Sequence, residues 1–155
     1  MSDLSDILND KAIDADMVAA NKKALFQQLA TAAAKQTGLP AKAIAAALSA
    51  REKIGSTGFG GGTAIPHAKI EGLGAVFGYF ARLEVPVDFQ SIDNMPVDLV
   101  FLLLSPPDAG AEHLKALARV SRIFRDAPTI AKLRGARSRD ALYALLAGEE
   151  ARDAA

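Results

Sequence analysis

The sequence predicts an α/β protein with three layers, α/β/α, in which a mixed sheet is flanked by helices. Both ends of the chain carry apolar residues at the three-to-four spacing of amphipathic helices. Two runs near the middle are rich in the β-branched and aromatic residues that strands favour. The strict alternation of strands and helices in a Rossmann domain is missing, so helices from both ends must cover one central sheet.

The composition excludes several classes of protein. A chain of 155 residues suits one domain, which we expect to span 1–155 with a frayed acidic tail at 149–155. Its 18 basic and 18 acidic residues cancel, unlike the charge of a nucleic-acid-binding protein. The lack of cysteine excludes a disulfide scaffold, a thiolate zinc site and a cysteine nucleophile. The N-terminal residues do not resemble a signal peptide, so we expect a cytoplasmic protein without membrane insertion.

The first part of the chain is expected to be helical. A helix capped by Asn21 should run to about the stop signal at Gly38. A second helix should open at Pro40, where the first turn tolerates proline, and end near Ile54. Residues 55–62 then include five glycines, which weaken both helix and strand interiors, so we expect a loop.

The middle and the end of the chain predict strands followed by helices. Residues 75–85 and 97–104 are typical of strands, and the second is apolar almost throughout, as expected for burial on both faces. A polar segment that ends in proline connects them. Helices should follow over about 109–126, 128–133 and 138–147.

His67 is the first candidate for chemistry because it comes directly after the glycine-rich segment. Exposed N–H groups in such a segment form a concavity that binds anions. Pro66 fixes its own φ and biases Ile65 toward an extended conformation, so a stiff segment presents the imidazole. Imidazole is a nucleophile that is mostly neutral near pH 7. A histidine that only hydrogen-bonds its neighbours remains the alternative.

Arg51 and His113 are further candidates, each with a structural alternative. Arg51 ends the second helix just before the glycines, where its planar guanidinium suits phosphoryl oxygens. It could equally be a solvated cation that favours the C-terminal helix dipole. His113 lies one turn into a helix, with apolar residues at helical spacing. It is either a histidine at the edge of the core or a second polar group at the site.

Other kinds of site are not predicted. The glycine-rich segment lacks the Gly-Lys-Ser/Thr of a Walker A loop, and no clear strand precedes it as in a dinucleotide-binding fingerprint. Neither a G-x-S-x-G nor an HExxH motif is present, and we expect no metal and no cofactor. Residues 115–139 hold eight basic residues and one acidic residue, Asp126. They are either solvated helix faces or a docking face for an acidic partner.

The segment REKIGSTGFGGGTAIPHAKIEGL, from Arg51 to Leu73, resembles the active-site signature of phosphotransferase-system enzyme IIA domains of the mannitol/fructose class. The resemblance continues through Ile92–Pro106 and Ala111–Phe124 and covers nearly the whole chain. The opening LSDIL, the segment AIDAD and the form R-E-x-x-G-S-T-G are most similar to the nitrogen-regulatory branch.

The resemblance implies a relay of phosphoryl groups between proteins. His67 matches the histidine that a histidine-containing phosphocarrier protein of the nitrogen branch phosphorylates, with Nε2 as the expected reacting atom. His113 matches the second active-site histidine, and Arg51 matches the arginine that borders the site. The implied phosphoryl-binding positions are Ser56, Thr57 and Gly62.

The resemblance also implies what the relay would serve. The protein would be a phosphotransferase component that acts mainly as a regulator of partners such as sensor kinases or potassium-transport components. A sugar-specific IIA subunit that passes phosphate to a fructose or mannitol IIB domain, or a non-catalytic anion-sensing module, remains open. Ala68 departs from the glycine common after the active histidine. Docking of another protein requires a shallow site, which we expect to be ringed by apolar residues such as Phe59, Ile65 and Ile92.

Overall fold

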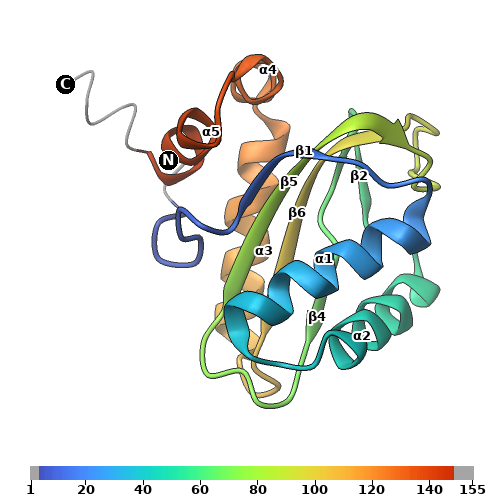
Figure 1. Ribbon diagram of the computed structural model, residues 1–155, viewed down its shortest axis with the longest axis vertical. Helices are drawn as coiled ribbons and strands as arrows, with labels where there is room; N and C mark the ends of the chain where they lie inside the picture. Colours follow the sequence, from blue (N-terminus) through green and yellow to red (C-terminus); the bar gives the residue numbers. More distant parts are fainter. Residues whose placement is uncertain (1–3, 149–155) are drawn as a thin grey trace.

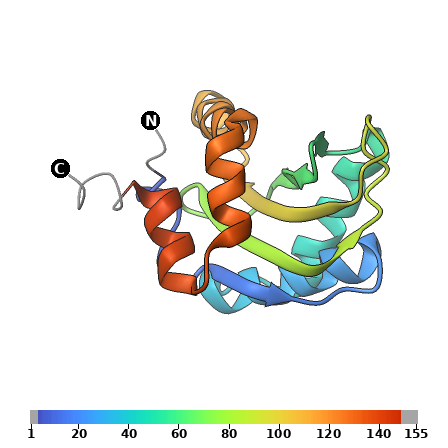
Figure 2. The same ribbon diagram turned by 90° about the horizontal axis from the view of Figure 1, so that it is seen from above.

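The computed structural model describes residues 4–148, and within them six strands form one mixed sheet between two layers of helices (Figures 1 and 2). The strands are β1 (Ile13–Met17), β2 (Gly58–Gly60), β3 (Thr63–Ala64), β4 (His67–Lys69), β5 (Phe77–Val87) and β6 (Val97–Ser105). Their order is β1-β5-β6-β3-β2, and β4 pairs with β6 as well. β1 runs parallel to β5, and β3 and β4 run parallel to β6, whereas the β5–β6 and β2–β3 pairs are antiparallel. The predicted mixed α/β architecture is confirmed.

The five predicted helices are confirmed to within about two residues at each end. They are α1 (Lys22–Thr37), α2 (Ala41–Ile54), α3 (Gly110–Arg125), α4 (Ala127–Gly135) and α5 (Arg139–Ala147). The side chains of Asn21 and Ser138 accept hydrogen bonds from N–H groups in the first turns of α1 and α5. Gly38 and Gly148 end these helices in the left-handed conformation. Figure 2 shows α1 and α2 on one side of the sheet and α3 on the other.

β6 is the centre of the core. Its residues 99–104 are completely buried, because helices cover both faces of the sheet at this strand. β5 lies along one side of β6, and β3 and β4 lie along the other. Burial on both faces accounts for the nearly continuous apolar sequence. The two strands predicted over 75–85 and 97–104 are therefore confirmed, with β5 displaced by two residues.

The prediction of a loop over residues 55–62 is wrong in part. Gly58–Gly60 forms β2, which pairs with β3 in a short antiparallel hairpin. Strand pairing uses backbone N–H and C=O groups, so a segment rich in glycine can still pair when its neighbours hold it. Glycine is required in the turn itself, since Gly61 and Gly62 have φ values of 65° and 82°.

The five-residue β1, the two-residue β3 and the three-residue β4 were not predicted. The expectation of a frayed tail at 149–155 lies outside the described residues. None of the helices within residues 4–148 combines the length and the apolar character that crossing a bilayer requires.

Candidate active site

His67 is the first residue of β4 and is held by the sheet. It lies opposite Leu103 of β6, and the carbonyl of Pro66 accepts a hydrogen bond from Leu103 N at 2.9 Å. Its side chain is half-buried. The backbone is thus anchored to the central strand while the imidazole still reaches the surface.

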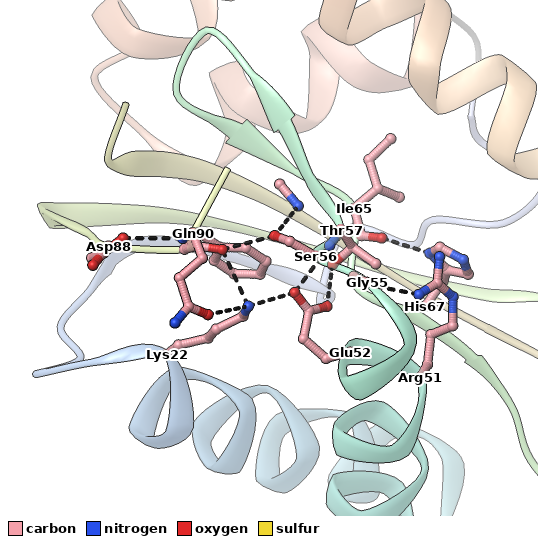
Figure 3. Close-up of polar contacts among 12 residues, drawn as sticks. Lys22, Arg51, Glu52, Gly55, Ser56, Thr57, Ile65, His67, Asp88 and Gln90 are labelled. Atoms are coloured by element: carbon pink, nitrogen blue, oxygen red, sulfur yellow. Dashed lines mark hydrogen bonds and ion pairs between the residues drawn. The ribbon is translucent and has the colours of Figure 1, made fainter. Parts of the chain in front are cut away.

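A single hydrogen bond determines which ring nitrogen of His67 is available. Nδ1 lies 2.7 Å from the carbonyl oxygen of Ile65 (Figure 3). A carbonyl oxygen can only accept, so Nδ1 carries the proton and donates it to Ile65. In the neutral ring, the lone pair therefore belongs to Nε2, and this is the atom positioned to act as a nucleophile.

His113 is brought to His67 from α3. Its ring centroid lies 5.6 Å from that of His67, and the two ring planes are inclined by 50°. His113 is buried, with 8% of its surface exposed, and its Nδ1 lies 2.6 Å from the hydroxyl oxygen of the buried Ser105. The two histidines of the sequence thus form one site, and Ser105 at the end of β6 orients the second ring.

Burial keeps both imidazoles neutral. Burial lowers the pKa of His67 below its ordinary 6.5, and the positive charge of Arg51 lowers it further. The hydrogen bond to the Ile65 carbonyl and the negative charge of Glu52 raise the pKa and so oppose this shift. Burial is also the largest cause of the lowered pKa of His113, followed by the charges of His67 and Lys69. At neutral pH the lone pair of His67 Nε2 is therefore not blocked by a proton.

Arg51 places a positive charge close enough to the His67 ring to act on it electrostatically. It lies in the last turn of α2, and its Nη1 donates to the carbonyl of Gly55 at 3.0 Å. This bond orients the guanidinium and uses only part of its donor capacity. The site can therefore offer a cation and N–H donors to an anion. Among residues 4–148 no cluster of three or more histidine, cysteine or acidic side chains is arranged to hold a metal ion.

The residues expected to bind phosphoryl oxygens lie elsewhere or are otherwise engaged. The hydroxyl of Ser56 donates to the Phe89 carbonyl at 2.8 Å, and that of Thr57 donates to Glu52 at 2.6 Å. The carbonyl of Gly62 accepts from the N–H groups of two residues at the start of β6. Thr63, the residue after Gly62, pairs with Leu99, whereas His67 pairs with Leu103, so Gly62 lies about 16 Å along the strand from His67 at ~3.3 Å per residue. The structure groups His67 with His113 and Arg51, and the role of the other three stays a prediction.

The apolar residues expected around His67 are Phe59, Ile65 and Ile92, of which Phe59 is half-buried and packed against the core. Ile65 is buried, and Ile92, although 91% exposed, lies in the loop that contacts the β2–β3 hairpin through Asp93 and Gly61. The exposed apolar side chains that adjoin site residues in the sequence are instead Ile54 and Leu114. Neither was singled out, because each occupies an ordinary helical position.

Three residues with a clear relation to the site were missed. Lys69 lies two residues after His67 in β4, and this spacing places both side chains on one face of the strand. Glu52 adjoins Arg51 within the motif and acts electrostatically on His67. Ser105 carried no local signal, since only the packing of α3 against β6 brings it to His113.

Comparisons with known proteins agree with this geometry. The family model described as "Phosphoenolpyruvate-dependent sugar phosphotransferase system, EIIA 2" matches residues 6–148. A nitrogen regulatory protein of Bradyrhizobium diazoefficiens is 48% identical over 144 residues, which cover 93% of this chain and 94% of the relative. The crystal structure of nitrogen regulatory protein IIA-Ntr from Neisseria meningitidis superposes with a TM-score of 0.88 at 35% identity, covering 92% of this chain and 98% of that one.

A more distant structure shares the fold. It is the complex of enzyme IIA for mannitol with phosphorylated enzyme IIB from Escherichia coli, with a TM-score of 0.77 at 20% identity over 92% of this chain and 99% of the other. The family model and the close relatives cover nearly all of the described residues. The chain therefore belongs to the EIIA 2 family of the phosphoenolpyruvate-dependent sugar phosphotransferase system, on its nitrogen-regulatory branch.

Proposed function

We propose that Nε2 of His67 accepts a phosphoryl group from a phosphohistidine of a carrier protein, and that the phosphorylation state of His67 controls other proteins. The observation that carries this proposal is the hydrogen bond from His67 Nδ1 to the Ile65 carbonyl. It leaves Nε2 as the nucleophile on a half-buried ring at the surface. Membership of the EIIA 2 family and the similarity to nitrogen regulatory proteins support both parts of the proposal.

The transfer exchanges one phosphorus–nitrogen bond for another. The lone pair of His67 Nε2 attacks the phosphorus, while the bond to the donor ring breaks and its electron pair returns to the donor imidazole. Positive charge develops on the His67 ring, and the Ile65 carbonyl stabilises it by accepting the Nδ1 proton in a hydrogen bond. Negative charge spreads over the three equatorial oxygens, so positioned cations and N–H donors supply most of the catalysis.

Arg51 and His113 are the groups best placed to meet those oxygens. The Arg51 guanidinium is oriented by the Gly55 carbonyl and carries a full positive charge. His113 Nδ1 is engaged by Ser105 Oγ, so Nε2 is the ring nitrogen left to face the phosphoryl oxygens, and with the Ser105 hydroxyl as donor it would carry the proton and donate a hydrogen bond. His113 would thus help through a hydrogen bond and not as a second acceptor.

Regulation follows from the charge that phosphorylation adds. A phosphoryl group brings roughly −1.5 to −2 charges near pH 7. In the unphosphorylated protein, Arg51 and the exposed Ile54 form an apolar and positively charged surface at the end of α2. A partner that covers this surface would distinguish the two forms by the change in charge.

The experiment combines the purified protein with phosphoenolpyruvate and the upstream proteins of the relay, followed by mass measurement. The wild type should gain one acid-labile phosphoryl group, and His67→Ala should gain none. His113→Ala should be labelled more slowly, and Arg51→Lys should lose transfer rate with little change in melting temperature. Full labelling of His67→Ala would refute the assignment.

Further arms separate the remaining functions. Transfer from the phosphorylated protein to a fructose-specific IIB domain would indicate a sugar-transport subunit. Binding of inorganic phosphate without any gain in mass under relay conditions would indicate an anion-sensing module instead of an acceptor. Neither result is expected for a regulator of the nitrogen branch.

A further inference from the structure

Glu52, next to Arg51 in α2, is an acidic residue buried beside the site. Only 9% of its side chain is exposed, and Lys22 Nζ lies 2.6 Å from its Oε2. Lys22 is itself held in place, since Nζ donates to the Phe89 carbonyl at 3.1 Å and lies 4.5 Å from the centre of the Phe89 ring. A buried carboxylate is retained only when it is paired and hydrogen-bonded.

Both oxygens of Glu52 bind the same residue. Oε2 accepts a hydrogen bond from Thr57 N at 2.9 Å, and Oε1 accepts one from Thr57 Oγ1 at 2.6 Å (Figure 3). Hydrogen bonds to an ionised acceptor are shorter and stronger than those between neutral groups. Two such bonds from one carboxylate determine both the position and the orientation of Thr57.

Thr57 is connected to His67 through Ile65. The carbonyl of Thr57 accepts a hydrogen bond from Ile65 N at 3.1 Å. The carbonyl of the same Ile65 accepts the Nδ1 proton of His67 at 2.7 Å. A continuous series of polar contacts therefore runs from Lys22 through Glu52 and Thr57 to the imidazole.

We propose that Glu52 is a positioning residue for His67: through Thr57 it orients the Ile65 carbonyl that keeps the proton on Nδ1 and leaves Nε2 free. In free histidine the tautomer with the proton on Nε2 is the more populated one, so the protein must hold the ring against this preference. The consequence for phosphoryl transfer rests on the proposed function. The effect on the tautomer does not, because it is a property of the unphosphorylated protein.

Glu52→Gln is the direct test, with Asp98→Asn as the matched control. Both substitutions remove the charge from a carboxylate in an ion pair near the β2–β3 hairpin, but the Asp98 side chain pairs with Arg134 and, among residues 4–148, forms no hydrogen bond with Thr57 or Ile65. Nitrogen-15 NMR of the histidine ring reports the tautomer directly. The wild type and Asp98→Asn should show the proton on Nδ1 of His67, and Glu52→Gln should show a substantial fraction with the proton on Nε2.

The variant should also change the chemistry at His67. The carboxylate of Glu52 raises the pKa of His67, so Glu52→Gln should lower that pKa further, as an NMR titration would measure. Phosphoryl uptake should fall by roughly ten- to a hundredfold, as expected for a misplaced reacting group. Loss of stability alone, with the tautomer and the pKa of His67 unchanged, would overturn the proposal and leave the assignment of His67 as acceptor untouched.

A second pair of variants covers the case in which Glu52→Gln does not fold. Thr57→Val removes the hydroxyl bond to Glu52 and keeps the N–H bond, whereas Thr57→Ser keeps both. Thr57→Val should shift the His67 tautomer in the same direction, and Thr57→Ser should restore the wild-type spectrum. Identical His67 spectra for these two variants would refute the path through Thr57.

Discussion

Replacing Gly58 by alanine should destabilise the protein through a steric clash that the structure defines. A Cβ at this position would lie 2.1 Å from Ser91 Oγ, 2.9 Å from Ser91 Cβ and 3.0 Å from Ser91 Cα. The φ of Gly58 is not in the left-handed region, so the effect is one of space alone. Rotation of the serine side chain relieves only the first contact, and the other two require the loop between β5 and β6 to move.

The expected loss is about 2 kcal/mol, the middle of the range of roughly 1–3 kcal/mol for overpacking. For a chain of this length, that loss lowers the melting temperature by about 4–8 °C. Urea denaturation followed by circular dichroism measures the free energy of unfolding directly.

Ser91→Gly supplies the second side of a double-mutant cycle. It removes the two side-chain contacts, and its hydroxyl is buried without a hydrogen-bond partner among the described residues, so its loss leaves no partner unsatisfied. Gly58→Ala should therefore be less destabilising in the Ser91→Gly background, with a coupling energy of about 1 kcal/mol. Equal losses in both backgrounds, or a Gly58→Ala variant as stable as the wild type, would refute the steric explanation.

Other predictions concern pH and the edge of the sheet. Burial lowers the pKa of His67 below 6.5, so the rate of phosphoryl uptake should be constant at neutral pH and should decline when acid protonates the ring. A rate that rises on acidification would contradict this prediction. Both histidines have lowered pKa values in the folded protein, so below pH ~6.5 the unfolded chain binds more protons than the folded one. The contribution of the two histidines to stability is therefore complete above that pH and is lost as the pH falls through their folded-state pKa values. A His67→Ala/His113→Ala variant should show a weaker decline of the urea midpoint on acidification. The Arg82 guanidinium donates hydrogen bonds to the carbonyls of Ala15 in β1 and of Ala136 after α4. Arg82→Ala should therefore lower the free energy of unfolding in urea by about 1–3 kcal/mol and accelerate amide hydrogen exchange in β1. Unchanged exchange in β1 would contradict this role.

The sequence by itself determined the helices and the two long strands, and it singled out His67 as the candidate reacting residue. Asn21, Gly38 and Ser138 act on N–H and C=O groups within a few residues of themselves, so the helix limits they predict depend little on the rest of the molecule. The apolar β6 could be recognised because burial on both faces leaves a continuous signal. The order of Arg51, the glycines and His67 was sufficient to indicate a site for an anion and the family to which the chain belongs.

Only the tertiary structure decided the short strands and the way the site is held. β1 has only five residues, in which apolar and acidic side chains alternate, and β2 consists largely of glycine, so pairing with a neighbouring strand decided both elements. The hydroxyls of Ser56 and Thr57 turn toward the scaffold because Phe89 and Glu52, which lie in other elements, accept their protons. Phe89 lies 33 residues from Ser56 along the chain, and residue type alone does not show which acceptor the fold brings to a hydroxyl.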